Sequence, residues 1–150
     1  MYTGLLHLHS FLRYIALILL IIATFKSISG FISRREFSGL DNKLSLFAFI
    51  SMHLQLTIGL ILYFISPIVK TGLSDMGSSM KEPSLRFWTV EHIAMMLVAI
   101  ILVTVGRITA KKATNDLSKH KKQAILFSIA LLIIFMAIPW PFSKVARAWF

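Results

Sequence analysis

The sequence predicts an all-helical membrane protein, a bundle of four transmembrane helices, and its composition and its long apolar runs support this. The chain has 150 residues, of which 57% are hydrophobic and 15% are charged. A soluble domain carries roughly 25% charged residues because its surface must be solvated. Here the apolar residues gather into four runs that approach or exceed the roughly 20 residues needed to cross about 30 Å of hydrocarbon. A soluble core is therefore excluded, and lipid is the expected solvent.

Each apolar run has recognisable boundaries. Pro67 ends the second run because proline cannot continue a helix, and Pro139 ends the fourth in the same way. Pro83 marks the start of the third, since proline is favoured near helix N-termini. The chain shows no internal repeat and no second domain, so residues 1–150 form one transmembrane domain. The four helices are expected at about residues 5–26, 44–66, 85–107 and 123–138.

The short connections make consecutive helices antiparallel neighbours, which predicts an up-down-up-down bundle. Ten Lys and Arg residues lie in or beside the first and third connections, and five, including Lys144 and Arg147, lie at the opposite ends of the helices. By the positive-inside rule the two basic connections are cytoplasmic, and both termini face the outer, periplasmic side. Three tryptophans fall at this outer boundary, as an aromatic belt would place them. They are Trp88, Trp140 and Trp149.

Composition also limits the chemistry. The net charge of +10 sits in short stretches between apolar runs, where Lys and Arg set topology and contact lipid headgroups, so no nucleic-acid partner is expected. The chain has no cysteine, which excludes disulfides, iron–sulfur clusters and covalently attached c-type haem. The first residues lack a basic segment and a small-residue cleavage site, so no cleavable signal peptide is expected.

Polar side chains inside the apolar runs are the candidate functional residues, because such groups are costly in lipid. His120, among lysines, is expected to be a solvated loop residue. The candidates within the predicted helices are His7, His9, Arg13, His53, Gln55, Glu91 and His92.

Depth selects one pair of histidines. At about 1.5 Å per residue, His9 lies roughly 12 Å and His92 roughly 7 Å on the outer side of the helix centres, whereas His53 lies about 4 Å on the other side. Two imidazoles at matched depth on diagonal helices suit axial ligation of a single haem b. Arg13 and Arg86 are then placed to pair with its propionates. His53 is the alternative ligand if the second helix is shifted outward.

Structural explanations remain open for each candidate. His9 is equally compatible with a helix cap or a headgroup contact. Arg13 can extend to the membrane surface or pair with Glu91. His53 can bond to a neighbouring helix, and Glu91 with His92 can form an interhelical pair without any cofactor.

Three segments carry a family resemblance: residues 6–14 (LHLHSFLRY), 53–64 (HLQLTIGLILYF) and 86–92 (RFWTVEH), the last on a helix that ends in Gly-Arg at 106–107. Over about residues 4–142 the chain resembles small bacterial four-helix inner-membrane proteins labelled cytochrome-b-like. The resemblance implies haem b, electron transfer and a bacterial inner-membrane location. The residues that match the family's motifs are His9, His53, Gln55, Glu91 and His92.

Three functions follow as hypotheses. The first is a membrane b-type cytochrome that holds one haem and passes electrons between a quinol or partner protein and another redox centre. The second is a non-catalytic small subunit or assembly partner of a larger respiratory or other membrane complex. The third is a conductor of protons or small solutes that uses His53 and Glu91 as relay groups.

Overall fold

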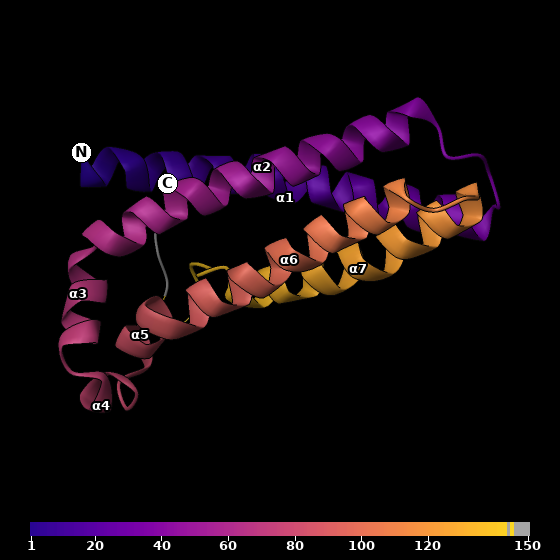
Figure 1. Cartoon of the computed structure of the whole chain (residues 1–150). Coiled ribbons are helices and arrows are strands. Elements are labelled where there is room, and N and C mark those ends of the chain that lie inside the picture. Colours follow the sequence, from indigo (N-terminus) through magenta and orange to yellow (C-terminus); the bar gives the residue numbers. More distant parts are fainter. Residues whose placement is uncertain (144, 146–150) are drawn as a thin grey trace.

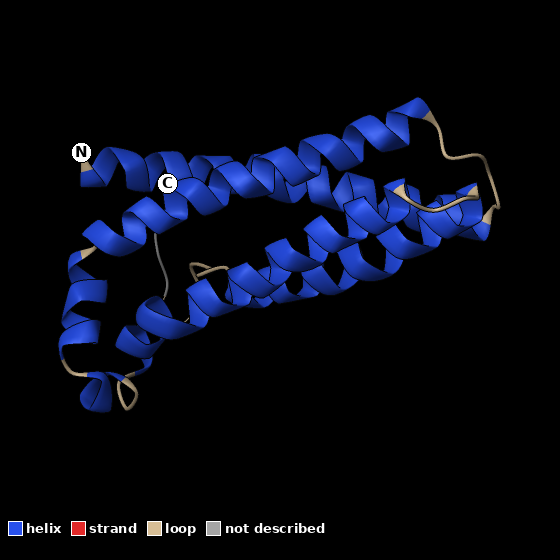
Figure 2. Ribbon diagram, viewed as in Figure 1, coloured by secondary structure: helices blue, strands red, loops and turns tan. Residues whose placement is uncertain are grey.

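A computed structural model of the chain describes residues 1–143 and residue 145, so Lys144, Arg147 and Trp149 lie outside the described residues. Within them the chain forms helices joined by turns (Figure 2). Four helical stretches are long and apolar enough to cross a membrane, which confirms the predicted fold class. They are α1 (Tyr2–Ile32), α2 (Gly39–Ile65), the stretch Pro83–Lys111 and α7 (Asp116–Ala137).

The helices form an up-down-up-down bundle (Figure 1). The third span consists of α5 (Pro83–Arg86), a π-helical turn η1 (Phe87–Glu91) and α6 (His92–Lys111). α1 packs against α2 and α7, and α6 packs against α7 and α2. Consequently α1 and α6 occupy diagonal corners of the bundle, as the short connections predicted.

The helices extend beyond their apolar runs. α1 continues to Ile32. α7 begins at Asp116 instead of residue 123, because its added turns are rich in lysine, a good helix former outside lipid as well. Asn115 caps α7 by accepting a hydrogen bond from the backbone N–H of Ser118. His120 thus lies on a helix and is fully buried, so the prediction of a solvated loop residue is wrong.

The connection between the second and third spans is also largely helical. α3 (Pro67–Ser74) starts directly after α2, with its proline in the first turn, where the missing N–H costs no hydrogen bond. α4 (Met76–Ser79) follows, and Asp75 caps it. Ser79 donates to the carbonyl oxygen of Gly72 at 2.9 Å, which ties the two short helices together at the end of the bundle that holds Met1 (Figure 1).

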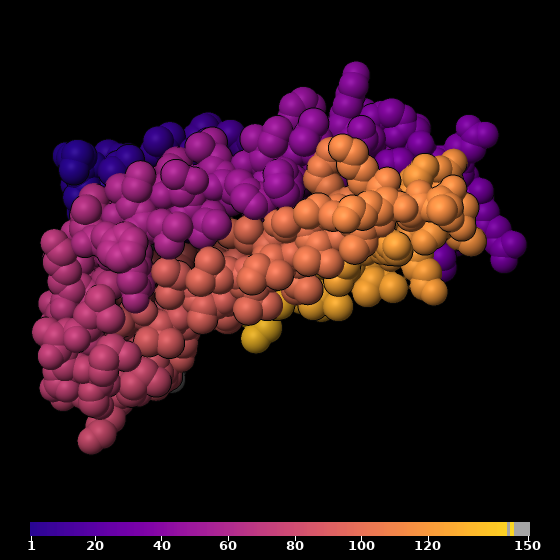
Figure 3. All heavy atoms as spheres, in the orientation of Figure 1, coloured from indigo at the N-terminus to yellow at the C-terminus, as the bar shows by residue number. Residues whose placement is uncertain are grey.

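The core holds many small residues, which allow helices to approach closely where lipid provides no hydrophobic drive between them. Side chains fill the space between the α2 and α6 ribbons on the face that Figure 3 presents. The largest fully buried apolar side chains are Phe127, Leu20 and Val103. The small buried residues packed around them are Ala16, Ala23, Ala48, Ala99 and Ala130.

Candidate functional site

A cavity of about 140 Å³ lies between α1, α2 and α6, toward the end of the bundle that carries α3. His9 and Arg13 reach it from α1, Gln55 from α2 and His92 from α6. Three of the five predicted site residues, His9, Arg13 and His92, therefore line one cavity, although α1 and α6 are diagonal. The rest of the lining is mainly apolar and includes Met52 and Met96, unbranched side chains that adapt to different shapes.

His92 is held in a fixed orientation. Its Nδ1 lies 2.8 Å from the carbonyl oxygen of Ala137 on α7. A carbonyl only accepts hydrogen bonds, so Nδ1 carries the proton and, in the neutral ring, Nε2 carries the lone pair. The rings of Phe87 and Trp88 pack against the imidazole at centroid distances of 5.7 and 5.6 Å. Histidines that ligate metals usually donate their other ring N–H in this way.

The π-helical turn determines where His92 points. The backbone N–H of His92 bonds to the carbonyl of Phe87, five residues earlier, instead of four. This wider turn rotates α6 relative to α5 and brings both Phe87 and Trp88 beside the imidazole. Isolated π-turns occur frequently at functional sites, and the expectation of a regular helix through residues 85–107 did not include one.

His9 is positioned by α2. The side-chain amide of Gln55 donates to the backbone carbonyl of His9 at 2.8 Å. Gly59 lies against the imidazole, and a Cβ atom at that position would come within 3.2 Å of its Cε1. The absence of a side chain at Gly59 therefore makes room for the ring. Gln55 and Gly59 thus connect α2 to His9 on α1.

The two predicted propionate-binding cations differ in position. Arg13 lines the cavity and donates to the Tyr14 hydroxyl at 2.9 Å, with the guanidinium 4.7 Å from the centre of that ring. Arg86 is not among the lining residues. Its Nε pairs with Glu91 at 2.6 Å, so Glu91 has Arg86 as its partner, whereas the sequence suggested Arg13.

His53 lies apart from the cavity. Its Nδ1 bonds within α2 to the carbonyl of Phe49 at 2.8 Å, and its Nε2 lies 3.5 Å from the hydroxyl of Thr104 on α6. These contacts match the structural explanation that the sequence left open for this residue. His7 is exposed on α1. Within residues 1–143 and 145, no three His, Cys, Asp or Glu side chains gather as a metal site.

A buried polar network joins all four spans at the opposite end of the bundle. Gln123 on α7 accepts from Ser27 on α1 at 3.1 Å and donates to Ser45 on α2 at 2.9 Å. Arg107 on α6 also donates to Ser45, at 2.9 Å. The sequence did not predict this network. Its only signal was single small polar residues near the ends of apolar runs, which are common at helix interfaces in membranes.

An ion pair lies beside this network. The carboxylate of Asp41 is buried and accepts from both Nη atoms of Arg35, at 2.6 and 2.8 Å. This hydrogen bond raises the pKa of the Arg35 guanidinium. Asp41 also completes a capping box with Ser38 at the start of α2. The pair therefore fixes the turn between α1 and α2.

Comparison with protein-family models, with curated proteins and with solved structures finds no match for this chain. The fold and the site together define a helical membrane protein with four spans and a cavity between them. Two histidines from diagonal helices line that cavity.

Proposed function

We propose that this protein is a b-type cytochrome-like electron carrier of the bacterial inner membrane, with one haem b between α1 and α6. His9 and His92 are the proposed axial ligands. The observation that carries the proposal is that these two side chains line the same cavity from diagonal helices. Haem bound there supplies one-electron chemistry, and a quinol or a partner protein is the proposed donor.

The donor set fits this group. Imidazole nitrogen is a common ligand of haem iron, and the Nδ1–carbonyl hydrogen bond of His92 is of the kind that orients metal-ligating histidines. Arg13 lies beside the cavity, where a guanidinium can pair with an anionic propionate. Arg86 supports the proposal less, because Glu91 already neutralises it.

The cavity size sets a condition on the proposal. At about 140 Å³ the cavity is smaller than the roughly 300–1,000 Å³ of typical ligand sites. Binding a macrocycle therefore requires α1 and α2 to move away from α6. Met52 and Met96 at this boundary can change rotamer during such a movement, since methionine has three rotatable bonds.

The relay hypothesis has less support. Glu91 is engaged by Arg86 at 2.6 Å, and the Nδ1 of His53 is engaged by the carbonyl of Phe49. Neither residue is among those that line the cavity. The remaining alternative, a small subunit or assembly partner without a cofactor, predicts a protein with no visible absorption.

A reduced-minus-oxidised absorption spectrum of the purified protein tests the proposal. We expect an α-band in the wild type, retained in His53→Ala and His7→Ala and lost in His9→Ala and His92→Ala. His7→Ala is the matched control, because this exposed histidine lies on the same helix as His9. Loss in His53→Ala with retention in His9→Ala would move the ligand to α2. Absence of the band in wild-type protein supplied with haem would remove the cytochrome proposal.

A further inference from the structure

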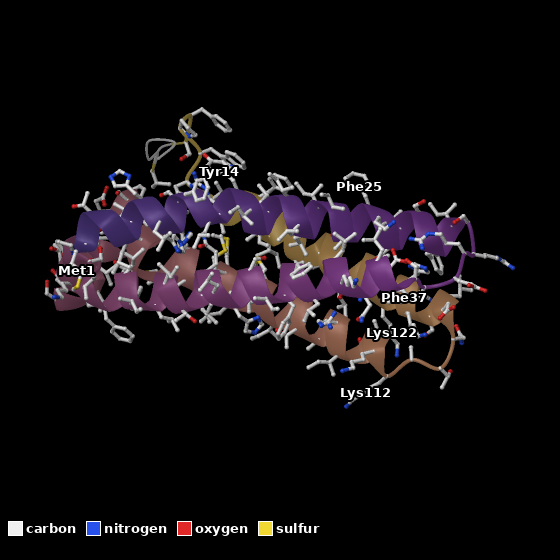
Figure 4. All side chains as sticks on the ribbon, turned by 90° about the horizontal axis from the view of Figure 1, so that it is seen from above. Met1, Tyr14, Phe25, Phe37, Lys112 and Lys122 are labelled. Carbon is white, nitrogen blue, oxygen red and sulfur yellow. The ribbon has the colours of Figure 1, made fainter. Side chains whose placement is uncertain are left out.

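A second pocket, of about 260 Å³, opens at the end of the bundle opposite Met1. The start of α2, the end of α6 and the first turns of α7 enclose it. Figure 4 shows Phe37, which lines the pocket, at the same end as Lys112 and Lys122. Three cationic side chains line it: Arg107, Lys111 and Lys119.

The positive charge of this pocket is only partly balanced by nearby carboxylates. Asp116 pairs with Lys119 at 2.7 Å, and Asp41, in the first turn of α2, pairs with Arg35. Within the described part of the chain, no Asp or Glu lies within ion-pair distance of Arg107 or Lys111. Two of the three cations are therefore available to an anion from outside the protein.

Two hydrogen bonds hold the Arg107 guanidinium in place and leave some of its N–H donors unused. Its Nη1 donates to the hydroxyl of Ser45 at 2.9 Å and to the backbone carbonyl of Asn42 at 3.2 Å. Both acceptors are neutral and both bonds use the same nitrogen. A guanidinium has five N–H donors, so Nε and Nη2 remain to bind a ligand in a planar, bidentate manner.

The backbone at the start of α2 also favours binding of an anion in this pocket. Gly39 and Asn42, in the first turns of α2, also line the pocket. The first N–H groups of a helix have no intrahelical acceptor, and the helix dipole places partial positive charge there. Within this turn the N–H of Asp41 already donates to the Ser38 hydroxyl and its carboxylate pairs with Arg35, so the N–H groups of Gly39 and Leu40 supply the remaining donors. Such helix ends favour phosphate groups.

We propose that this pocket binds a phosphate group, supplied either by the headgroup of an anionic phospholipid or by a soluble phosphate. Arg107 and Lys111 are the binding side chains, and the N-terminus of α2 completes the site. Both residues lie in the last turns of the span Pro83–Lys111, at the level where headgroups meet the helix end. The proposal does not depend on haem.

Binding can be measured by native mass spectrometry of the full chain in detergent, with dioleoyl-phosphatidylglycerol, dioleoyl-phosphatidylcholine or inorganic phosphate added. We expect phosphatidylglycerol to bind more tightly than phosphatidylcholine. Lys111→Gln should weaken this binding roughly fivefold, since each cation near a membrane surface contributes about 1 kcal/mol. Lys112→Gln is the matched control, because it removes the same charge one residue further along, outside the pocket lining.

The result identifies the source of the phosphate. Saturable phosphatidylglycerol binding that Lys111→Gln weakens and Lys112→Gln leaves unchanged supports a lipid site. Saturable binding of inorganic phosphate with the same dependence on Lys111 supports a soluble ligand instead. Equal weakening in the two variants would show that only diffuse surface charge acts. Equal affinity for the two lipids with no phosphate binding would show that the pocket does not select an anion. Either result would overturn the proposal.

Discussion

The imidazole Nδ1 of His92 donates a 2.8 Å hydrogen bond to the carbonyl oxygen of Ala137, and this contact joins the start of α6 to the end of α7. Ala137 is the last residue of α7, so its carbonyl has no partner within its own helix. His92 thereby satisfies a helix end and orients its own ring toward the cavity. Its structural role and its proposed ligating role would use different nitrogen atoms and can be tested separately.

His92→Asn should separate them. The amide nitrogen of asparagine lies at the same δ position as Nδ1, so it can still donate to Ala137, but it has no equivalent of Nε2. We expect stability close to that of the wild type, whereas His92→Ala should lose about 1 kcal/mol with the hydrogen bond. Unfolding in mixed detergent–SDS micelles, followed by circular dichroism, measures both. Equal destabilisation in the two variants would contradict a structural hydrogen bond at this position.

Ser45→Ala should destabilise the bundle by about 1–3 kcal/mol, because it leaves Arg107 and Gln123 without their shared buried acceptor. Ser51→Ala on the same helix is the control, since that hydroxyl bonds only to the carbonyl of Ala48 within α2. Its expected effect is below about 0.5 kcal/mol. The same SDS titration compares the two, and similar values would mean that the polar network adds no stability.

Gly30→Ala should disrupt the packing between α1 and α7. A Cβ atom at Gly30 would overlap the buried ring of His120, which must then move. Overpacking of this kind costs about 1–3 kcal/mol. At Gly4, on the same helix, a Cβ meets no neighbour within 4 Å, so Gly4→Ala should be neutral or slightly stabilising. Thermal unfolding in detergent distinguishes them, and equal melting temperatures would contradict this packing.

Orientation in the membrane follows from the distribution of cations and can be tested with single cysteines, since the chain has none. Thr114→Cys, in the basic connection between α6 and α7, should resist an impermeant thiol reagent in intact cells. Lys81→Cys, between α4 and α5, should react. Both side chains are exposed at these positions, so burial does not protect either from the reagent. The reverse labelling pattern would invert the topology and leave the four spans unchanged.

The candidate site was only partly predictable. Depth along each span follows from residue number, because an α-helix rises by a constant amount per residue. That was enough to select His9 and His92, which do line one cavity. It did not reveal that Gln55 holds the backbone of His9, or that Arg86 pairs with Glu91. Those partners depend on how the helices rotate about their axes.

The sequence alone determined the number of spans, their approximate positions and their antiparallel order, because lipid requires long apolar runs and short connections restrict neighbours. The structure alone decided three further features: the π-turn before His92, the burial of His120 and the network around Gln123. The burial of His120 and the network around Gln123 arise from contacts between residues distant in the chain. Helix rotation and close packing determine such contacts. The surface of each helix is similarly apolar on all sides, so the hydropathy pattern does not show how the helix is rotated about its axis.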